Sequence, residues 1–172
     1  MANTTFNGPV RAENGFIGVT KDSSTGAITE NITFGNNGVV AAPVALGDED
    51  KTMTAAANGG RVNVVPALAS NRTITLPAPT AGLSFTFING GGAEETENVI
   101  FITPGNTNFF LGGVIHLTGT PASVYPNGSS NSQLTLTDFG LMEITFIAKD
   151  STNWYVSGYQ QGADAPAFAD QW

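Results

Sequence analysis

Residues 72–87 read RTITLPAPTAGLSFTF, and this stretch decides the fold class. Polar and apolar residues alternate over 73–76 and again over 83–87, and a period of two places one set of side chains on a buried sheet face. Two prolines and a glycine separate the runs, and proline cannot donate a hydrogen bond to a strand ladder. The stretch therefore predicts two β-strands joined by a turn.

Strand patterns continue along the rest of the chain. Residues 133–137 and 142–148 alternate in the same way, and residues 153–157 predict a last strand. Residues 98–103 are apolar through their middle, which predicts a central strand buried on both faces. The best helical candidate, residues 48–57, lacks a wide apolar stripe and predicts no long helix.

Eight to ten short strands fit between residues 61 and 158. This spacing predicts an all-β fold, an antiparallel β-sandwich or barrel that is jelly-roll-like, with an extended N-terminal arm. We expect residues 1–50 to form the arm, a hairpin and a connector, residues 51–160 the sandwich domain, and residues 161–172 a C-terminal tail.

The expected arm contains a hairpin, with strands at 15–20 and 27–34 around a turn at 21–26. A lone hairpin is marginally stable in water. The arm must therefore lie on the main domain or on another chain, and the sequence leaves both open.

Composition excludes several classes of function. The 172 residues contain 6 Lys and Arg against 14 Asp and Glu, a net charge of -8, so the chain is unsuited to binding nucleic acid. No apolar run approaches the roughly 18–20 residues that cross a bilayer, so no membrane partner is expected. There is no Cys, which removes disulfides, thiol catalysis and zinc–thiolate sites.

Few residues offer chemistry. His116 is the only histidine and lies outside any recognisable nucleophile motif, which favours a structural role, although a Ser-His-Asp site assembled in space stays open. The acidic runs 48–50 and 94–97 lack the spacing of a calcium loop and indicate solvated loops. We therefore expect no metal, no cofactor and no enzyme, with a polysaccharide hydrolase as the enzymatic alternative.

Several segments resemble virion proteins of tailed bacteriophages. Residues 64–87 contain a TLP-x-P-x-x-G turn before an aromatic strand, and residues 154–158 read W-x-V-x-G. Together they resemble a β-module of such virion proteins, particularly those of marine phages. Residues 4–16 are similar to the start of small head-associated proteins of marine phages.

The resemblance is strongest to a capsid decoration (cement) protein. It implies a homotrimer on the outer capsid surface of the virion that binds the major capsid protein, stabilises the shell, and assembles in the host bacterial cytoplasm. The module also occurs in tail fibres. The alternative is therefore a receptor- or glycan-binding module of a head or tail fibre, for which Tyr125, Trp154 and Tyr155 would supply an aromatic surface.

Aromatic residues in the arm and the tail are the expected contacts with the capsid or another partner. Exposed aromatic side chains near chain ends usually find a partner surface. The expected partner-binding residues are Phe6, Arg11, Phe16, Phe34, Phe168 and Trp172.

Overall fold

The computed structural model describes residues 16–35, 38–92 and 94–171. The chain divides into two compact units, Met1–Ala42 and Pro43–Trp172. The boundary lies earlier than the expected one at residue 50, because the chain already pairs with the second unit's sheet at residue 44.

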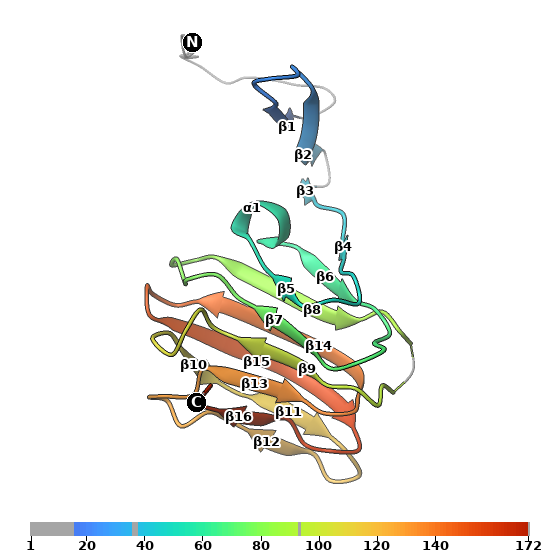
Figure 1. Ribbon diagram of the computed structural model, residues 1–172, viewed down its shortest axis with the longest axis vertical. Helices are drawn as coiled ribbons and strands as arrows, with labels where there is room; N and C mark the ends of the chain where they lie inside the picture. Colours follow the sequence, from blue (N-terminus) through green and yellow to red (C-terminus); the bar gives the residue numbers. More distant parts are fainter. Residues whose placement is uncertain (1–15, 36–37, 93, 172) are drawn as a thin grey trace. The chain divides into compact units, whose positions relative to one another are not determined.

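The first unit holds a three-stranded antiparallel sheet in the order β1-β2-β3 (Figure 1). Its strands are β1 (Phe16–Lys21), β2 (Ile28–Gly35) and β3 (Gly38–Val40). The Asp22 carboxylate accepts hydrogen bonds from the amides of Ser24 (2.7 Å) and Thr25 (2.8 Å), and these bonds shape the turn between β1 and β2. β1 and β2 correspond to the expected hairpin, and β3 falls in the expected connector.

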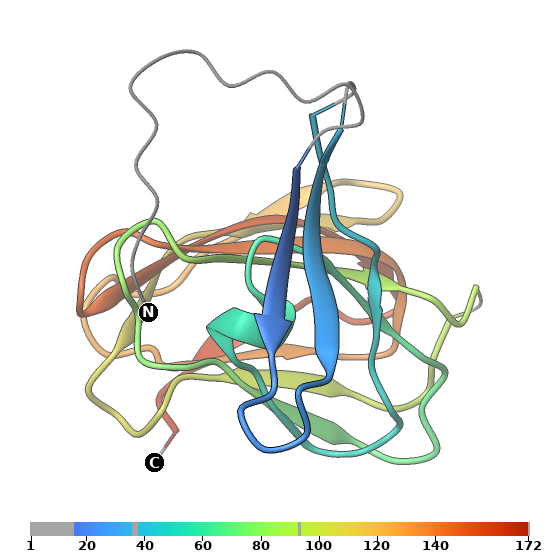
Figure 2. The ribbon, with the colours of Figure 1, turned by 90° about the horizontal axis from the view of Figure 1, so that it is seen from above.

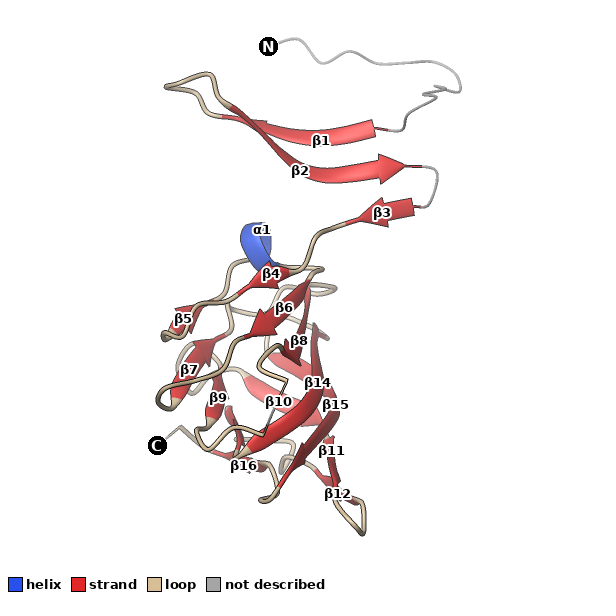
Figure 3. Cartoon of the chain, turned by 90° about the vertical axis from the view of Figure 1, so that its right-hand side faces the viewer, coloured by secondary structure: helices blue, strands red, loops and turns tan. Residues whose placement is uncertain are grey.

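The second unit consists of two sheets and one short helix, which is blue in Figure 3. The eight-stranded sheet contains, in order, β12 (Ala122–Val124), β11 (Val114–Leu117), β15 (Asn153–Gly162), β14 (Phe139–Ala148), β8 (Ser84–Asn89), β6 (Val62–Val65) and β4 (Val44–Ala45), while β10 (Phe109–Gly112) pairs with β15. The five-stranded sheet contains β16 (Ala167–Ala169), β13 (Gln133–Leu136), β9 (Val99–Ile102), β7 (Arg72–Thr75) and β5 (Lys51–Thr52).

The two sheets lie as layers over a shared aromatic core (Figure 2). Phe101 of the five-stranded sheet has its ring centroid 4.7 Å from that of Phe87 and 5.1 Å from that of Phe146, both in the eight-stranded sheet. Phe85 and Trp154 add a second pair at 5.7 Å, and all five side chains are fully buried. The prediction of an all-β sandwich is confirmed.

The prediction that the sheets are antiparallel is wrong in part. From β4 to β9 the chain alternates between the layers, so β4, β6 and β8 become parallel neighbours in one sheet, and β5, β7 and β9 in the other. The proline-rich stretch after β7 is therefore a crossover between sheets. These parallel pairs also distinguish the fold from an antiparallel jelly roll.

Two local predictions need correction. β9 is central in its sheet, but only Val99 and Phe101 are buried, while Ile100 and Ile102 are half-buried on its outer side. The helical candidate contains a single turn, α1 (Ala55–Asn58), which begins where the Thr54 hydroxyl accepts a hydrogen bond from the Ala57 amide.

The expected tail belongs to the sandwich. β15 extends to Gly162, and β16 pairs with β13 as the edge of the five-stranded sheet. Gln171 Nε2 donates to the Thr103 carbonyl at 2.9 Å, so the segment after β16 is hydrogen-bonded to the same layer. The sequence did not predict this strand, because three residues are too few to show a recognisable alternation of polar and apolar side chains.

Candidate interaction surface

The outward side of the eight-stranded sheet is the most distinctive surface of the second unit, and we call it the outer face. Residues alternate along β15 and along β14 from Met142 onward, so that Phe146 and Val156 point to the core while Ile147 and Tyr155 point outward. Its central residues are Ser84, Thr86, Ile88, Ile115, Leu117, Leu141, Glu143, Thr145, Ile147, Tyr155, Ser157, Tyr159 and Gln161.

Strand register arranges these side chains in rows. In one row Ile115 lies beside Tyr159, which lies beside Glu143 and then Ile88. In another, Leu111 of β10 lies beside Tyr155, which lies beside Ile147 and then Ser84. Neighbouring side chains in such rows pack directly against each other.

The outer face gathers the exposed apolar side chains of the second unit. Among its described residues the large hydrophobic side chains that remain exposed are Ile115, Leu117, Tyr125, Leu141, Ile147 and Tyr155, with exposed fractions from 37% to 75%. Five of them lie on strands of the outer face. Tyr125 follows β12 and lies beside Gly113, where an added Cβ would be 3.3 Å from the Tyr125 Cβ.

The outer face carries little charge. Glu143 is the one charged side chain among its central residues. The other carboxylates of this unit lie in loops or at strand ends, including the acidic runs 48–50 and 94–97. Most of the negative charge of this unit therefore lies away from its exposed apolar side chains, with Glu94 beside Leu117 and Leu141 as an exception.

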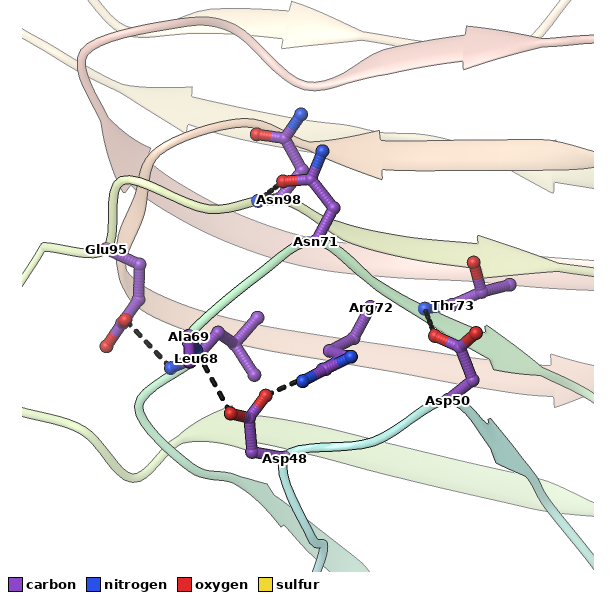
Figure 4. Close-up of polar contacts among 9 residues, drawn as sticks. All are labelled: Asp48, Asp50, Leu68, Ala69, Asn71, Arg72, Thr73, Glu95 and Asn98. Carbon is purple, nitrogen blue, oxygen red and sulfur yellow. Dashed lines mark hydrogen bonds and ion pairs between the residues drawn. The ribbon is translucent and has the colours of Figure 1, made fainter.

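Three carboxylates of the acidic runs, those of Asp48, Asp50 and Glu95, accept hydrogen bonds from backbone amides (Figure 4). Asp48 Oδ1 accepts from Arg72 Nε at 2.7 Å, and Asp48 Oδ2 accepts from the Ala69 amide at 3.1 Å. Asp50 Oδ1 accepts from the Thr73 amide at 2.9 Å. The hydrogen bond from Arg72 lowers the pKa of the Asp48 carboxyl below its ordinary value.

Glu95 completes this arrangement from the other acidic run. Its carboxylate is buried and accepts from the Leu68 amide at 3.1 Å, while Asn71 Oδ1 accepts from the Asn98 amide at 2.8 Å. The loop before β7 crosses between the sheets, so its amides have no ladder partner and take these side-chain oxygens. The interpretation of both runs as solvated charge is incomplete for this reason.

His116 has a structural environment. Its ring faces inward from β11 and is buried, and its Nε2 lies 2.9 Å from the Gly162 carbonyl oxygen. This contact ties β11 to the end of β15. Within the described ranges no group of three or more His, Cys, Asp or Glu residues is placed to hold a metal ion.

The predicted partner-binding residues divide between the units. Phe6, Arg11 and Trp172 lie outside the described residues. Phe16 and Phe34 are register partners at the end of the β1–β2 pair. Phe168 is half-buried on β16, and its ring centroid lies 6.3 Å from that of Phe110 in the core, so it contributes to the sandwich's own packing.

The aromatic set expected for glycan binding is not one surface. Trp154 is fully buried against Phe85, so it cannot contact a ligand. Tyr155 and Tyr125 are exposed by 49% and 75%, and they border the Gly112–Gly113 junction between β10 and β11. Strand alternation alone could have found this, because 154 and 155 point to opposite sides of their strand.

Two shallow depressions adjoin the end of the outer face. One of about 290 Å³ is lined by Gly92, Glu94, Gly140, Leu141 and Gln161. The other, of about 330 Å³, shares Glu94 and Gln161 and adds Leu117 and Thr118. Their linings mix one carboxylate with a carboxamide and leucines, which suits contact with a surface more than acid–base chemistry.

No helix in the described part of the chain is both long and apolar enough to cross a membrane. Comparisons with models of protein families, with curated proteins and with solved structures found no match for the chain.

Proposed function

We propose that this chain is a structural virion protein that decorates the outer shell of a bacteriophage capsid and stabilises it by binding the major capsid protein. The observation that carries the proposal is the division into a sandwich and a separate N-terminal sheet. The resemblance of residues 4–16, 64–87 and 154–158 to phage virion proteins supports the same function. The role is mechanical and requires no catalytic group.

The sandwich is poorly suited to pairing with a partner through its edges. Its edge strands β4 and β5 have two residues each, and β12 and β16 have three each. Short edge strands limit strand addition by other chains. Attachment by strand addition is therefore assigned to the N-terminal unit.

β1 is the strand that suits such attachment. It has six residues and, within the described part of the chain, pairs with β2 alone. A capsid subunit would add a strand beside it, with main-chain hydrogen bonds for affinity and side chains for specificity. The proposed anchors are Phe6, Arg11, Phe16 and Phe34, and Trp172 stays a predicted contact.

Three copies in one homotrimer would make weak individual contacts into firm attachment, because the second and third contacts form at high effective concentration. The net charge of -8 would keep decorated particles dispersed. The proposed location is the outer capsid surface, with assembly in the host bacterial cytoplasm.

The test compares the full chain with a variant lacking residues 1–35 for binding to undecorated capsids of the phage that encodes it. We expect the truncated chain to lose binding while the near-ultraviolet spectrum of the buried Trp154 is unchanged. Purified virions should contain a copy number near that of the capsid protein or a simple fraction of it. A few copies at the tail would contradict the proposal.

A second candidate is a receptor- or glycan-binding fibre module, and the exposed pair Tyr125 and Tyr155 is the observation that favours it. Binding to a glycan array should then be lost in Tyr155→Ala and Tyr125→Ala variants. Trp154→Ala is unsuitable because it disrupts the core. Clean absence of binding by the wild-type chain would reject this candidate.

A further inference from the structure

The exposed apolar side chains of the sandwich are confined to one side. Ile115, Leu117, Leu141, Ile147 and Tyr155 all project from the outer face, and Tyr125 borders it. The outward residues of the five-stranded sheet are half-buried, and they include the polar Thr73, Gln133 and Thr135 as well as Ile100 and Ile102 of β9. The polar row Thr86, Thr145 and Ser157 divides these side chains into two groups, Ile147 with Tyr155 on one side and Ile115, Leu117 and Leu141 on the other. Several exposed apolar side chains gathered on one side of a domain are typical of a protein–protein contact.

All three tyrosines of the chain belong to this side, because Tyr159 lies between Ile115 and Glu143 in the central row. Tyrosine is enriched at protein interfaces, since it buries a large ring and keeps a hydroxyl for hydrogen bonding. The outer face therefore has the composition of an interface core.

Charge indicates which partner fits. Residues 43–172 contain eleven Asp and Glu against four Lys and Arg, and one of the eleven, Glu143, lies among the central residues of the outer face. Two copies of this unit would repel each other through their acidic loops but not through this nearly uncharged side. A basic protein would bind the acidic loops instead, and nucleic acid or anionic lipid would require a cluster of basic residues, of which the central residues of this side contain none.

We propose that the outer face is the contact between copies of this chain, with Tyr155, Tyr159 and Ile147 at its centre. The edges of both sandwich sheets are too short for two sandwiches to join by strand pairing, so contact between sandwiches uses the face. Tyrosine hydroxyls from a neighbouring copy are the donors that the Glu143 carboxylate requires once water is excluded. The inference concerns the purified chain and does not depend on capsid binding.

The test is the mass of the full chain in solution, measured by sedimentation equilibrium over a range of concentrations. Wild type should form dimers or trimers. Ile147→Glu, at a position 43% exposed, should weaken association at least tenfold, while Val19→Glu, at a β-branched position 53% exposed in the N-terminal sheet, should leave it unchanged. Tyr155→Glu, at a position 49% exposed, is a second variant should Ile147→Glu fail to fold.

Salt adds an independent readout. Raising NaCl from about 0.05 M to about 0.5 M screens repulsion between negatively charged copies and should strengthen association. Labelling of the three tyrosines by a tyrosine-selective reagent should fall as the wild-type concentration rises.

Three outcomes would overturn the inference. A wild-type chain that stays monomeric at about 100 µM has no interface of useful strength. Equal dissociation by Val19→Glu and Ile147→Glu, or by Val19→Glu alone, would assign association to the N-terminal sheet. Association that weakens with salt would indicate pairing of opposite charges, which the outer face does not offer.

Discussion

Asp48 shows how single carboxylates organise the crossover before β7. Its two oxygens accept from Arg72 and from the Ala69 amide, while Glu95 accepts from the Leu68 amide and Asp50 from the amide of Thr73 at the start of β7. The sequence shows acidic runs, but the amides that they accept from lie about 20 to 30 residues away along the chain. These hydrogen bonds between a carboxylate and a distant amide depend on the path of the chain between the sheets. The polar and apolar alternation of the sequence does not reveal that path.

Asp48→Asn should lower the melting temperature at pH 7 and have a smaller effect at pH 3. The folded chain lowers the pKa of Asp48, so its stabilising contribution is complete above the ordinary carboxyl pKa of 3.8 and is lost as the pH falls through the lower folded value. Thermal melts at both pH values provide the measurement. Glu49→Gln, on the same loop, is the control, and an equal loss in both variants would contradict the assignment.

Gly112→Ala should destabilise the sandwich much more than Gly60→Ala. Both glycines have positive φ, +90° for Gly112 and +66° for Gly60. A Cβ added to Gly112 would collide with the Val156 carbonyl oxygen, whereas a Cβ added to Gly60 would have no neighbouring atom within 4 Å. We expect about 1 kcal/mol for Gly60→Ala from backbone strain alone and about 3 kcal/mol or more for Gly112→Ala. Denaturant unfolding measures both, and equal costs would refute the steric argument.

At the scale of elements, β10 and β11 behave as one strand interrupted at Gly112–Gly113. Phe109 pairs with Asn153 and Ile115 with Tyr159, so the same register along β15 continues across the break. Alternation predicted the strands at β7, β8, β13 and β14 well. It did not predict which sheet each strand joins, since a strand's pattern reports its buried side and not its neighbours.

Phe168→Ala should lower the free energy of unfolding by about 2–3 kcal/mol, because the half-buried ring packs against Phe110 and the core. A partner-binding role, as the sequence suggested, would instead leave stability unchanged. Denaturant unfolding followed by tryptophan fluorescence measures the change. Ala167→Ser, exposed on the same strand, is the control and should change little.

At the scale of the whole molecule, the described hydrophobic core lies entirely within Pro43–Trp172. Its described members run from Leu46 to Val156, with Phe168 packed against them. The length of 172 residues is consistent with one compact domain plus an arm or tail, or with two very small domains. The position of the boundary could not be predicted, because the two residues of β4 carry no pattern that separates a strand from a connector.

A fragment of residues 43–172 should therefore fold without the first unit and keep the thermal transition of the full chain's sandwich. The fragment is made by expressing residues 43–172 alone, because Pro43 blocks proteolytic cleavage of the bond after Ala42. Mass spectrometry identifies the fragment, and near-ultraviolet circular dichroism tests its packing. An unfolded fragment would show that the sandwich requires the N-terminal sheet.

The alternation of β4 to β9 between the two layers also bears on the order in which the chain folds. Between two paired strands in this part, the chain passes through the other sheet and returns. Val44 is thus paired with Asn63, and Arg72 with Val99. Loops of this length close slowly compared with a hairpin. β14 and β15 are consecutive antiparallel strands of ten residues each. They are therefore expected to form the folding nucleus, onto which the strands from β4 to β9 pack later. The part of the sandwich synthesised last would thus be the first to become ordered.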